Sequence, residues 1–80
     1  MPTPMIRFSP HAECRMRLHR VTHREVEAAV ANPDIRIPGR QGRTVIRTRV
    51  RGRGLRVVVE PRDRDMLVVS VFAPGESDTR

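Results

Sequence analysis

The chain changes its periodicity at Asn32-Pro33, and this change constrains the fold more than any other feature. Before it, apolar residues recur at helical spacing behind two helix-start signals; after it, valine-rich segments alternate with arginine. Proline stops a helix because it lacks the amide donor and restricts the residue before it. Helices and strands grouped in separate parts of a chain are typical of α+β proteins. We therefore predict an α+β fold with two N-terminal helices packed on an antiparallel sheet of three or four strands.

The first helix is predicted from Pro10 to about His19. Ser9 supplies a hydroxyl N-cap, and Pro10 suits the first helical position, whose amide has no helical partner. On a helical wheel, one arc of about 200° mixes ionisable groups with apolar ones. An ordinary amphipathic helix would place leucine or isoleucine at the centre of such an arc, so this helix departs from the pattern. The arc consists of Cys14, Leu18, His11, Arg15, His19, Ala12 and Met16.

The second helix has stronger boundary signals. Thr22 followed by Glu25 is a capping box, in which each side chain accepts a hydrogen bond from the other's backbone amide. Val21 and Val26 occupy the two positions of a hydrophobic staple. Asn32-Pro33 ends the helix. The predicted buried stripe consists of Val26, Ala29 and Val30.

Strand patterns follow the break, and Met5–Phe8 is either a short edge strand or a lead-in to the first helix. Residues 43–51 and 55–60 alternate between apolar and polar side chains, which is typical of strands with one buried face. Residues 66–72 are apolar on both faces, which favours a central strand. The predicted extended segments are 34–38, 43–51, 55–60 and 66–72.

The arginine-rich strand places several cations on one face of the sheet. If Val50 pairs with Leu55 across the turn 52–54, Arg49 lies opposite Arg56. Like charges opposed across strands destabilise each other. Such a face is therefore either a solvated edge hairpin whose charges prevent aggregation, or a surface that receives a polyanion such as RNA. Alternation gives this face Arg47, Arg49 and Arg51.

Eighty residues are enough for one domain, expected over 1–80 with its core at about 6–73 and a disordered tail at 74–80. The net charge is +7, and all 16 basic residues are arginine. Arginine in place of lysine is due either to codon usage in a GC-rich genome or to its planar, bidentate contacts with phosphate oxygens. Codon usage does not explain the excess of positive charge, which attracts phosphates. The aromatic residues are Phe8 and Phe72, which disfavours OB-fold and RRM proteins that bind by base stacking.

The single cysteine, Cys14, excludes an intramolecular disulfide and fits a reducing compartment. No apolar run reaches the length of a membrane span, and the first residues lack the pattern of a signal peptide. We therefore expect a cytoplasmic protein that does not bind membranes.

Metal-independent RNA cleavage needs a proton-transfer group near the 2′-hydroxyl and cations that stabilise the charge developing at phosphorus. His11 and Arg15, at positions i and i+4, project from the same side of the first helix, with His19 a further turn along. In the alternative interpretation both are structural: His11 hydrogen-bonds a backbone carbonyl, and Arg15 pairs with a carboxylate such as Asp34 or Glu60.

Two other chemistries are disfavoured. The spacing of His11, Cys14, His19 and His23 matches no zinc pattern, so neither a metal nor a cofactor is predicted. Cys14 lacks the orienting group that an activated nucleophile needs, and it is expected to be a small buried residue.

The motifs also have a characteristic order along the chain. A Ser-x-His-Ala-x-x-Arg-Met helix start precedes an Arg-x-Ile/Val-Ser/Thr turn, an Asn-Pro helix end and a Gly-Arg-x-Leu-x-Val-Val-Val strand. This order resembles a bacterial family, the domain of unknown function DUF4258, over about 8–72. The family commonly has glycine after the arginine at position 20, where this chain has Val21. The matching stretches are Ser9–Met16, Arg20–Thr22, Glu25-Val26, Asn32–Asp34 and Gly54–Val59.

The resemblance extends more distantly to RelE-type and BrnT toxins in the barnase–EndoU–colicin–RelE superfamily. It implies a RelE-like fold, RNA as the target and, as is frequent among such toxins, an acidic antitoxin that covers the basic face. It also implies that His11 and Arg15 are the functional pair on the helix, with Arg20 and Arg56 as further site residues.

We therefore expect a RelE-like toxin that acts as a metal-independent ribonuclease. His11, helped by His19, would exchange protons, while Arg15 and Arg56 would stabilise the phosphorane. Two alternatives stay open: a non-catalytic RNA- or ribosome-binding module, and a protein-interaction domain with an acidic partner. The oligomeric state also stays open. The predicted RNA-binding residues are Arg20, Arg47, Arg49 and Arg51.

Overall fold

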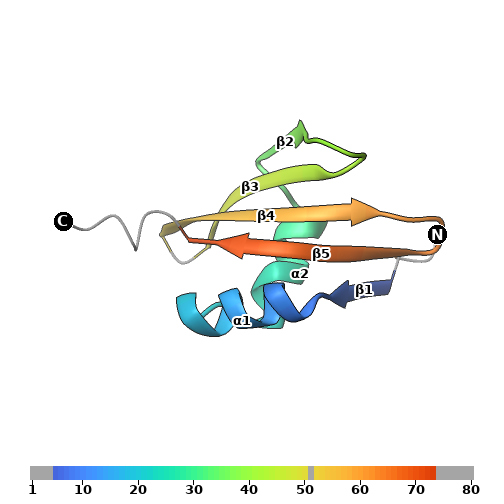
Figure 1. The fold of residues 1–80 in the computed structure, drawn as a ribbon. Coiled ribbons are helices and arrows are strands. Elements are labelled where there is room, and N and C mark those ends of the chain that lie inside the picture. Colours follow the sequence, from blue (N-terminus) through green and yellow to red (C-terminus); the bar gives the residue numbers. More distant parts are fainter. Residues whose placement is uncertain (1–4, 51, 74–80) are drawn as a thin grey trace.

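The computed structural model describes residues 5–50 and 52–73. These residues form two helices and one mixed sheet (Figure 1). The five strands of the described chain lie in the order β1-β5-β4-β3-β2. Both helices fall between β1 and β2 in the sequence. The elements are β1 (Met5–Phe8), α1 (Pro10–His19), α2 (His23–Ala31), β2 (Ile35–Pro38), β3 (Thr44–Val50), β4 (Arg53–Pro61) and β5 (Asp65–Phe72).

The prediction of an α+β protein with two N-terminal helices is confirmed, but the sheet differs from the expected one. It has five strands in the described residues, not three or four. It is also mixed rather than antiparallel, because β1 runs parallel to β5 from Met5↔Asp65 to Phe8↔Val68. This pairing joins β1 and β5, which are far apart in the sequence and are not connected by a hairpin turn. No turn motif therefore predicts it. The predicted tail, 74–80, lies outside the described residues.

Helix α1 begins where β1 leaves the sheet. The hydroxyl of Ser9 accepts a hydrogen bond from the amide of Ala12 and donates one to the carbonyl of Val69, both at 3.0 Å. The Ser9 amide also donates to the carbonyl of Val68. Val69 is the extra residue of an irregularity between β4 and β5, where the register shifts. Ser9 therefore caps the helix and fixes its start to β5 at the same time.

The predicted capping box of α2 is confirmed. The amide of Glu25 donates to the Thr22 hydroxyl at 3.1 Å, and the Thr22 amide donates to Oε1 of Glu25 at 2.9 Å. Val21 and Val26, the predicted staple residues, both belong to the buried core. The helix ends before Pro33, as its sequence predicted.

The predicted register of the arginine hairpin was wrong by two residues. Val50 pairs with Arg53 rather than with Leu55, which leaves two residues between the paired positions. Gly52 has φ +80°, a left-handed conformation typical of glycine in short hairpin turns. As a result Arg56 lies opposite Arg47, not opposite Arg49.

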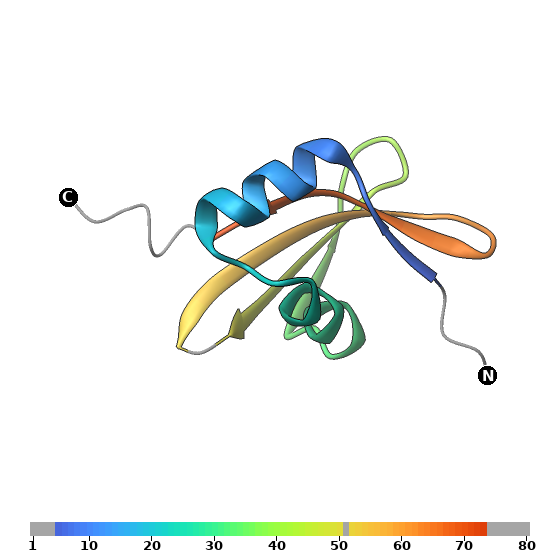
Figure 2. The same cartoon turned by 90° about the horizontal axis from the view of Figure 1, so that it is seen from below.

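The core lies between the helices and one face of the sheet. Helix α2 packs against β3 and β4, and α1 packs against β5 (Figures 1 and 2). Ile46, Val57 and Val71 form a cross-strand row at the centre, each at most 2% exposed. In the described chain, no helix covers the opposite face of β2, β3 and β4 (Figure 2).

Helix α1 buries only one end of its mixed arc. Ala12 and Met16 enter the core, whereas Leu18 is 65% exposed. Cys14 is also exposed, so the prediction that it is buried was wrong. The helix packs against β5, while His11 and Arg17 on its other sides are exposed.

Candidate nucleic-acid interface

A row of four side chains crosses the open face of the sheet. Residues paired across neighbouring strands point to the same face, and Ile35 pairs with Arg47, Arg47 with Arg56, and Arg56 with Phe72. Arg47 and Arg56 are both exposed. Two guanidinium groups are thus held side by side on adjacent strands, with an aromatic ring beside them on β5.

Helix α1 extends this row from the other side. The guanidinium carbon of Arg15 lies over the Phe72 ring, 5.6 Å from its centre, in a cation–π contact. Arg15 is half-buried, and its Nε is a buried atom without a hydrogen-bond partner among the described residues. The predicted carboxylate partners of Arg15 are not used, since Glu60 pairs with Arg43 and no ion pair forms with Asp34. Arg15 is therefore held by a ring and not by an acid.

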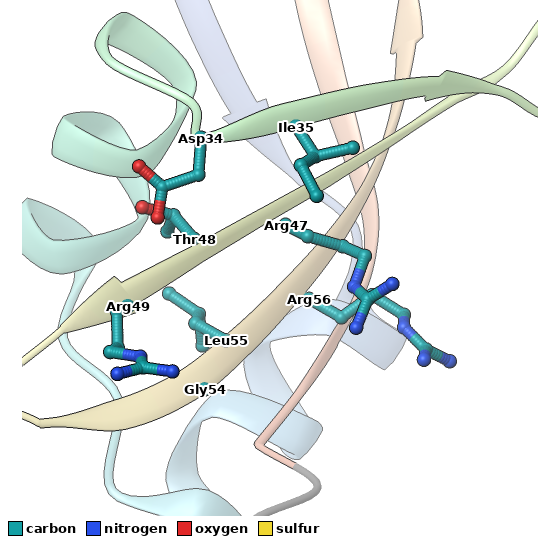
Figure 3. Close-up of a pocket in the computed structure, with 8 residues that line it drawn as sticks. All are labelled: Asp34, Ile35, Arg47, Thr48, Arg49, Gly54, Leu55 and Arg56. Carbon is teal, nitrogen blue, oxygen red and sulfur yellow. The ribbon is translucent and has the colours of Figure 1, made fainter.

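A hollow of about 210 Å³ opens beside the row (Figure 3). Gly54 pairs with Arg49, and a Cβ built on Gly54 would meet no atom within 4 Å. The missing side chain therefore leaves space between the neighbouring arginines. The residues that line the hollow are Asp34, Ile35, Arg47, Thr48, Arg49, Gly54, Leu55 and Arg56.

The arginines of this hollow have no ion-pair partners in the part of the chain that the structure describes. Within residues 5–50 and 52–73, no carboxylate lies within 4.0 Å of the guanidinium nitrogens of Arg47, Arg49 or Arg56, while Arg7 and Arg43 pair with Asp65 and Glu60. Figure 3 places the Asp34 carboxylate on the far side of the hollow from Arg47 and Arg56. We call Arg15, Arg47, Arg49 and Arg56 the arginine face; its cations are available to an external anion.

The predicted histidines lie one turn before and one turn after Arg15 on α1 and do not line the hollow. His11 is exposed on α1, one turn before Arg15, and His19 is half-buried one turn after it. Arg20 has φ +58° at the C-cap of α1, and its carbonyl accepts a hydrogen bond from Arg53. Arg20 does not line the hollow. The remaining predicted residue, Arg51, lies outside the described part of the chain.

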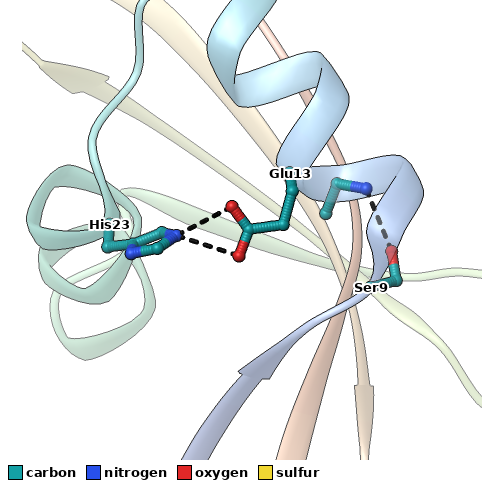
Figure 4. A network of polar contacts seen from close by, with 4 residues as sticks. Ser9, Glu13 and His23 are labelled. Carbon is teal, nitrogen blue, oxygen red and sulfur yellow. Dashed lines mark hydrogen bonds and ion pairs between the residues drawn. The ribbon is translucent and has the colours of Figure 1, made fainter.

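His23 belongs to a separate cluster that joins the two helices (Figure 4). Its Nε2 lies 3.1 Å from both carboxylate oxygens of Glu13, and its ring stacks on Phe8 at 4.3 Å between centres. Glu13 projects from the opposite side of α1 to Arg15. Among the described residues, no group of three or more histidine, cysteine or acidic residues is arranged to hold a metal ion.

Sequence analysis missed three features of this site. Phe72 was assigned to a central strand but not to the arginine face, and Gly54 was assigned to a turn. Asp34 was considered only as a partner for Arg15. The alternating pattern could have placed Phe72 and Gly54 on the open face, but only the true register sets them beside Arg56 and Arg49.

The arrangement defines a small α+β protein with an uncovered, arginine-lined sheet face. Residues 8–73 match the family described as Domain of unknown function (DUF4258). Because this match covers most of the chain, the protein belongs to that family, and the predicted resemblance is confirmed to this extent. No curated protein and no solved structure matches the chain. In the described residues, neither helix is long and apolar enough to cross a membrane.

Proposed function

We propose that this protein binds the phosphate backbone of RNA with its arginine face and cleaves it as a RelE-like, metal-independent ribonuclease. The supporting observation is that Arg47 and Arg56 lie opposite each other on two strands. Arg15 of α1 stacks on Phe72, the next residue of the same row. Planar guanidinium groups bind phosphate oxygens in a bidentate manner. Such a row has the positive charge to bind a polyanion.

The energetics of the free protein favour an anion here. Arg47 and Arg56 repel each other, and like charges directly opposite destabilise a sheet by up to about 1 kcal/mol. The net charge of +7 adds a long-range attraction for nucleic acid. A bound phosphate would turn the local repulsion into attraction, because both cations would share one counter-ion. Binding of this type weakens steeply as the salt concentration rises.

Cleavage requires more than binding. In our proposal the 2′-hydroxyl attacks the adjacent phosphorus, the bond to the 5′-oxygen breaks, and protons leave the first oxygen and reach the second. His11 would transfer these protons, assisted by His19, while Arg15 and Arg56 stabilise the negative charge of the phosphorane. Arg47 and Arg49 would hold the neighbouring backbone. RNA on the ribosome is one target to test, and an acidic antitoxin is the kind of partner that would cover these charges.

The direct test incubates the purified protein with labelled RNA at low salt in EDTA. Cleavage is expected, and His11→Ala should reduce its rate by about 10²-fold or more, because general acid–base groups contribute rate factors of that size. His23→Ala is the matched control, since it removes an exposed imidazole from the Glu13 cluster instead. Equal rates for His11→Ala and the unaltered protein would refute the catalytic role of His11.

A second candidate function is RNA or ribosome binding without cleavage. The observation that favours it is the composition of the hollow, whose lining contains three arginines but no histidine. This candidate predicts salt-sensitive RNA binding, intact RNA after incubation, and no catalytic effect of His11→Ala. A domain that recognises only an acidic protein would instead fail to bind RNA tightly at physiological salt.

A further inference from the structure

The ring of Phe72 is the one aromatic group that the described sheet brings to the arginine face. We infer that Phe72 and Arg15 form a stacking subsite for an unpaired nucleobase beside the phosphate-binding hollow. The arginine face would then select single-stranded RNA over duplex RNA. This inference rests on the proposed RNA binding and adds the class of substrate to it.

The first support is the position of the ring relative to the hollow. Phe72 pairs directly with Arg56, which lines the hollow. Neighbouring strands lie about 4.8 Å apart, so the ring is about one strand spacing from Arg56 and two from Arg47. A single nucleotide can therefore place its phosphate among the guanidiniums while its base reaches the ring. A phosphate site without a flat apolar group nearby would offer the base no such contact.

The second support is the state of Arg15. Its guanidinium covers the Phe72 ring, yet Nε has no hydrogen-bond partner in the described chain. Planar guanidinium groups can stack on unpaired bases as well as on aromatic rings. Among the described residues Arg15 forms no ion pair, so its guanidinium can move from the ring to an incoming base or phosphate without breaking one.

A third observation concerns the hydroxyl of Ser70. Ser70 lies two residues before Phe72 on the same side of β5, is 7% exposed, and has no hydrogen-bond partner for Oγ among the described residues. Buried polar groups are normally hydrogen-bonded, so an orphan hydroxyl beside a ring is unusual. A base stacked on Phe72 would bring a polar edge to this side of β5, where the hydroxyl could donate to it or accept from it.

Duplex RNA cannot use this subsite. Its bases are paired and stacked on each other, and a duplex presents mainly phosphates and 2′-hydroxyls to proteins. Stacking on a protein ring requires a base that is free to leave its neighbours. The hollow would still contact a duplex through its phosphates. The difference in affinity between single-stranded and duplex RNA therefore measures the contribution of the ring.

The test measures fluorescence anisotropy of a short labelled RNA whose 2′-hydroxyls are methylated, so that cleavage by 2′-hydroxyl attack cannot occur. The same strand is measured alone, annealed to its complement, and with one base removed. The single strand should bind best, and Phe72→Leu should weaken that binding about 5-fold to 100-fold, the range for loss of one stacked base. Phe72→Tyr keeps a stacking ring and should retain affinity, and a thermal melt of each variant confirms folding.

Salt dependence separates the ring from the phosphates. Phe72→Leu should leave the slope of log affinity against log salt unchanged, whereas Arg47→Gln, the matched electrostatic control, should lower that slope by about one. RNA binding that is equal for single strand and duplex, and unaffected by Phe72→Leu, overturns the stacking subsite but not the proposed RNA binding. Absence of any RNA binding at low salt overturns the proposed function itself.

Discussion

The two faces of the β3–β4 hairpin share one backbone but have opposite environments. Ile46 and Val57 point toward the helices and are at most 2% exposed, while their chain neighbours Arg47 and Arg56 point away and are exposed. Each face is therefore set by every second residue. Residues of one face therefore contribute to stability, and their neighbours in sequence, on the other face, contribute to the proposed anion binding. A substitution on one face should change one of these two properties and leave the other nearly unchanged.

The largest effect should come from the covered face. Ile46→Ala removes buried methyl groups from the central row and should lower the free energy of unfolding by about 2–5 kcal/mol. Val45→Ala, on the open face and half-buried, should cost less than half as much. Urea denaturation followed by circular dichroism measures both. Equal losses would show that the open face is also buried, for example in an oligomer.

A smaller loss is expected at the junction of the two faces. Helix α1 sends Met16 into the core and Arg15 to the open face, and its start depends on Ser9. Ser9→Ala removes the N-cap and the link to the Val69 carbonyl, which should lower the free energy of unfolding by about 1 kcal/mol. A lower melting temperature of Ser9→Ala in a thermal melt would show this loss of stability. Ser9→Asp, which retains the cap acceptor, should recover part of the loss, and a lack of recovery would argue against capping as the cause.

The open face should tolerate a larger side chain without loss of stability. Gly54→Val fills the hollow, where a Cβ meets no atom within 4 Å, and should raise the free energy of unfolding by about 0.5–1 kcal/mol because glycine weakens strands. RNA affinity should fall at the same time, since the space between the arginines is lost. A variant that is more stable yet binds RNA unchanged would remove the hollow from the proposed site.

The smallest effect is expected in the exposed cluster at the helices. Glu13→Gln weakens the contact with His23, whose side chain is 53% exposed, and should change the free energy of unfolding by less than about 1 kcal/mol. The stacking of His23 on Phe8 does not depend on that carboxylate. Chemical denaturation at neutral pH is the measurement. A loss as large as that of Ile46→Ala would mean that this cluster is part of the core.

The helices could be predicted almost completely because their ends are specified locally. The Ser9 and Thr22…Glu25 caps are hydrogen bonds between residues three apart, so both partners can be recognised within a short stretch of sequence. The positions of the later strands along the chain also followed from alternation and apolar runs. For Met5–Phe8 an edge strand was one of two alternatives, but its parallel pairing with β5 could not be predicted, because β5 is far away in the sequence.

The site was only half predictable. Sequence analysis found the arginines of the hairpin and of α1, but it paired Arg49 with Arg56. A shift of two residues keeps every side chain on the same face, so alternation cannot detect it. Only the length of the turn decides the register, and with it the neighbours of Gly54 and Phe72.

The sequence by itself determined the α+β class, the limits of both helices and the basic character of one sheet face, because these depend on periodicity, capping and charge within short stretches. Tertiary structure alone decided that β1 adds a parallel edge, that Arg15 stacks on Phe72, and that a glycine opens a hollow among arginines. Those features depend on contacts between residues far apart in the chain. Their geometry is fixed by packing over the whole core, not by any local pattern.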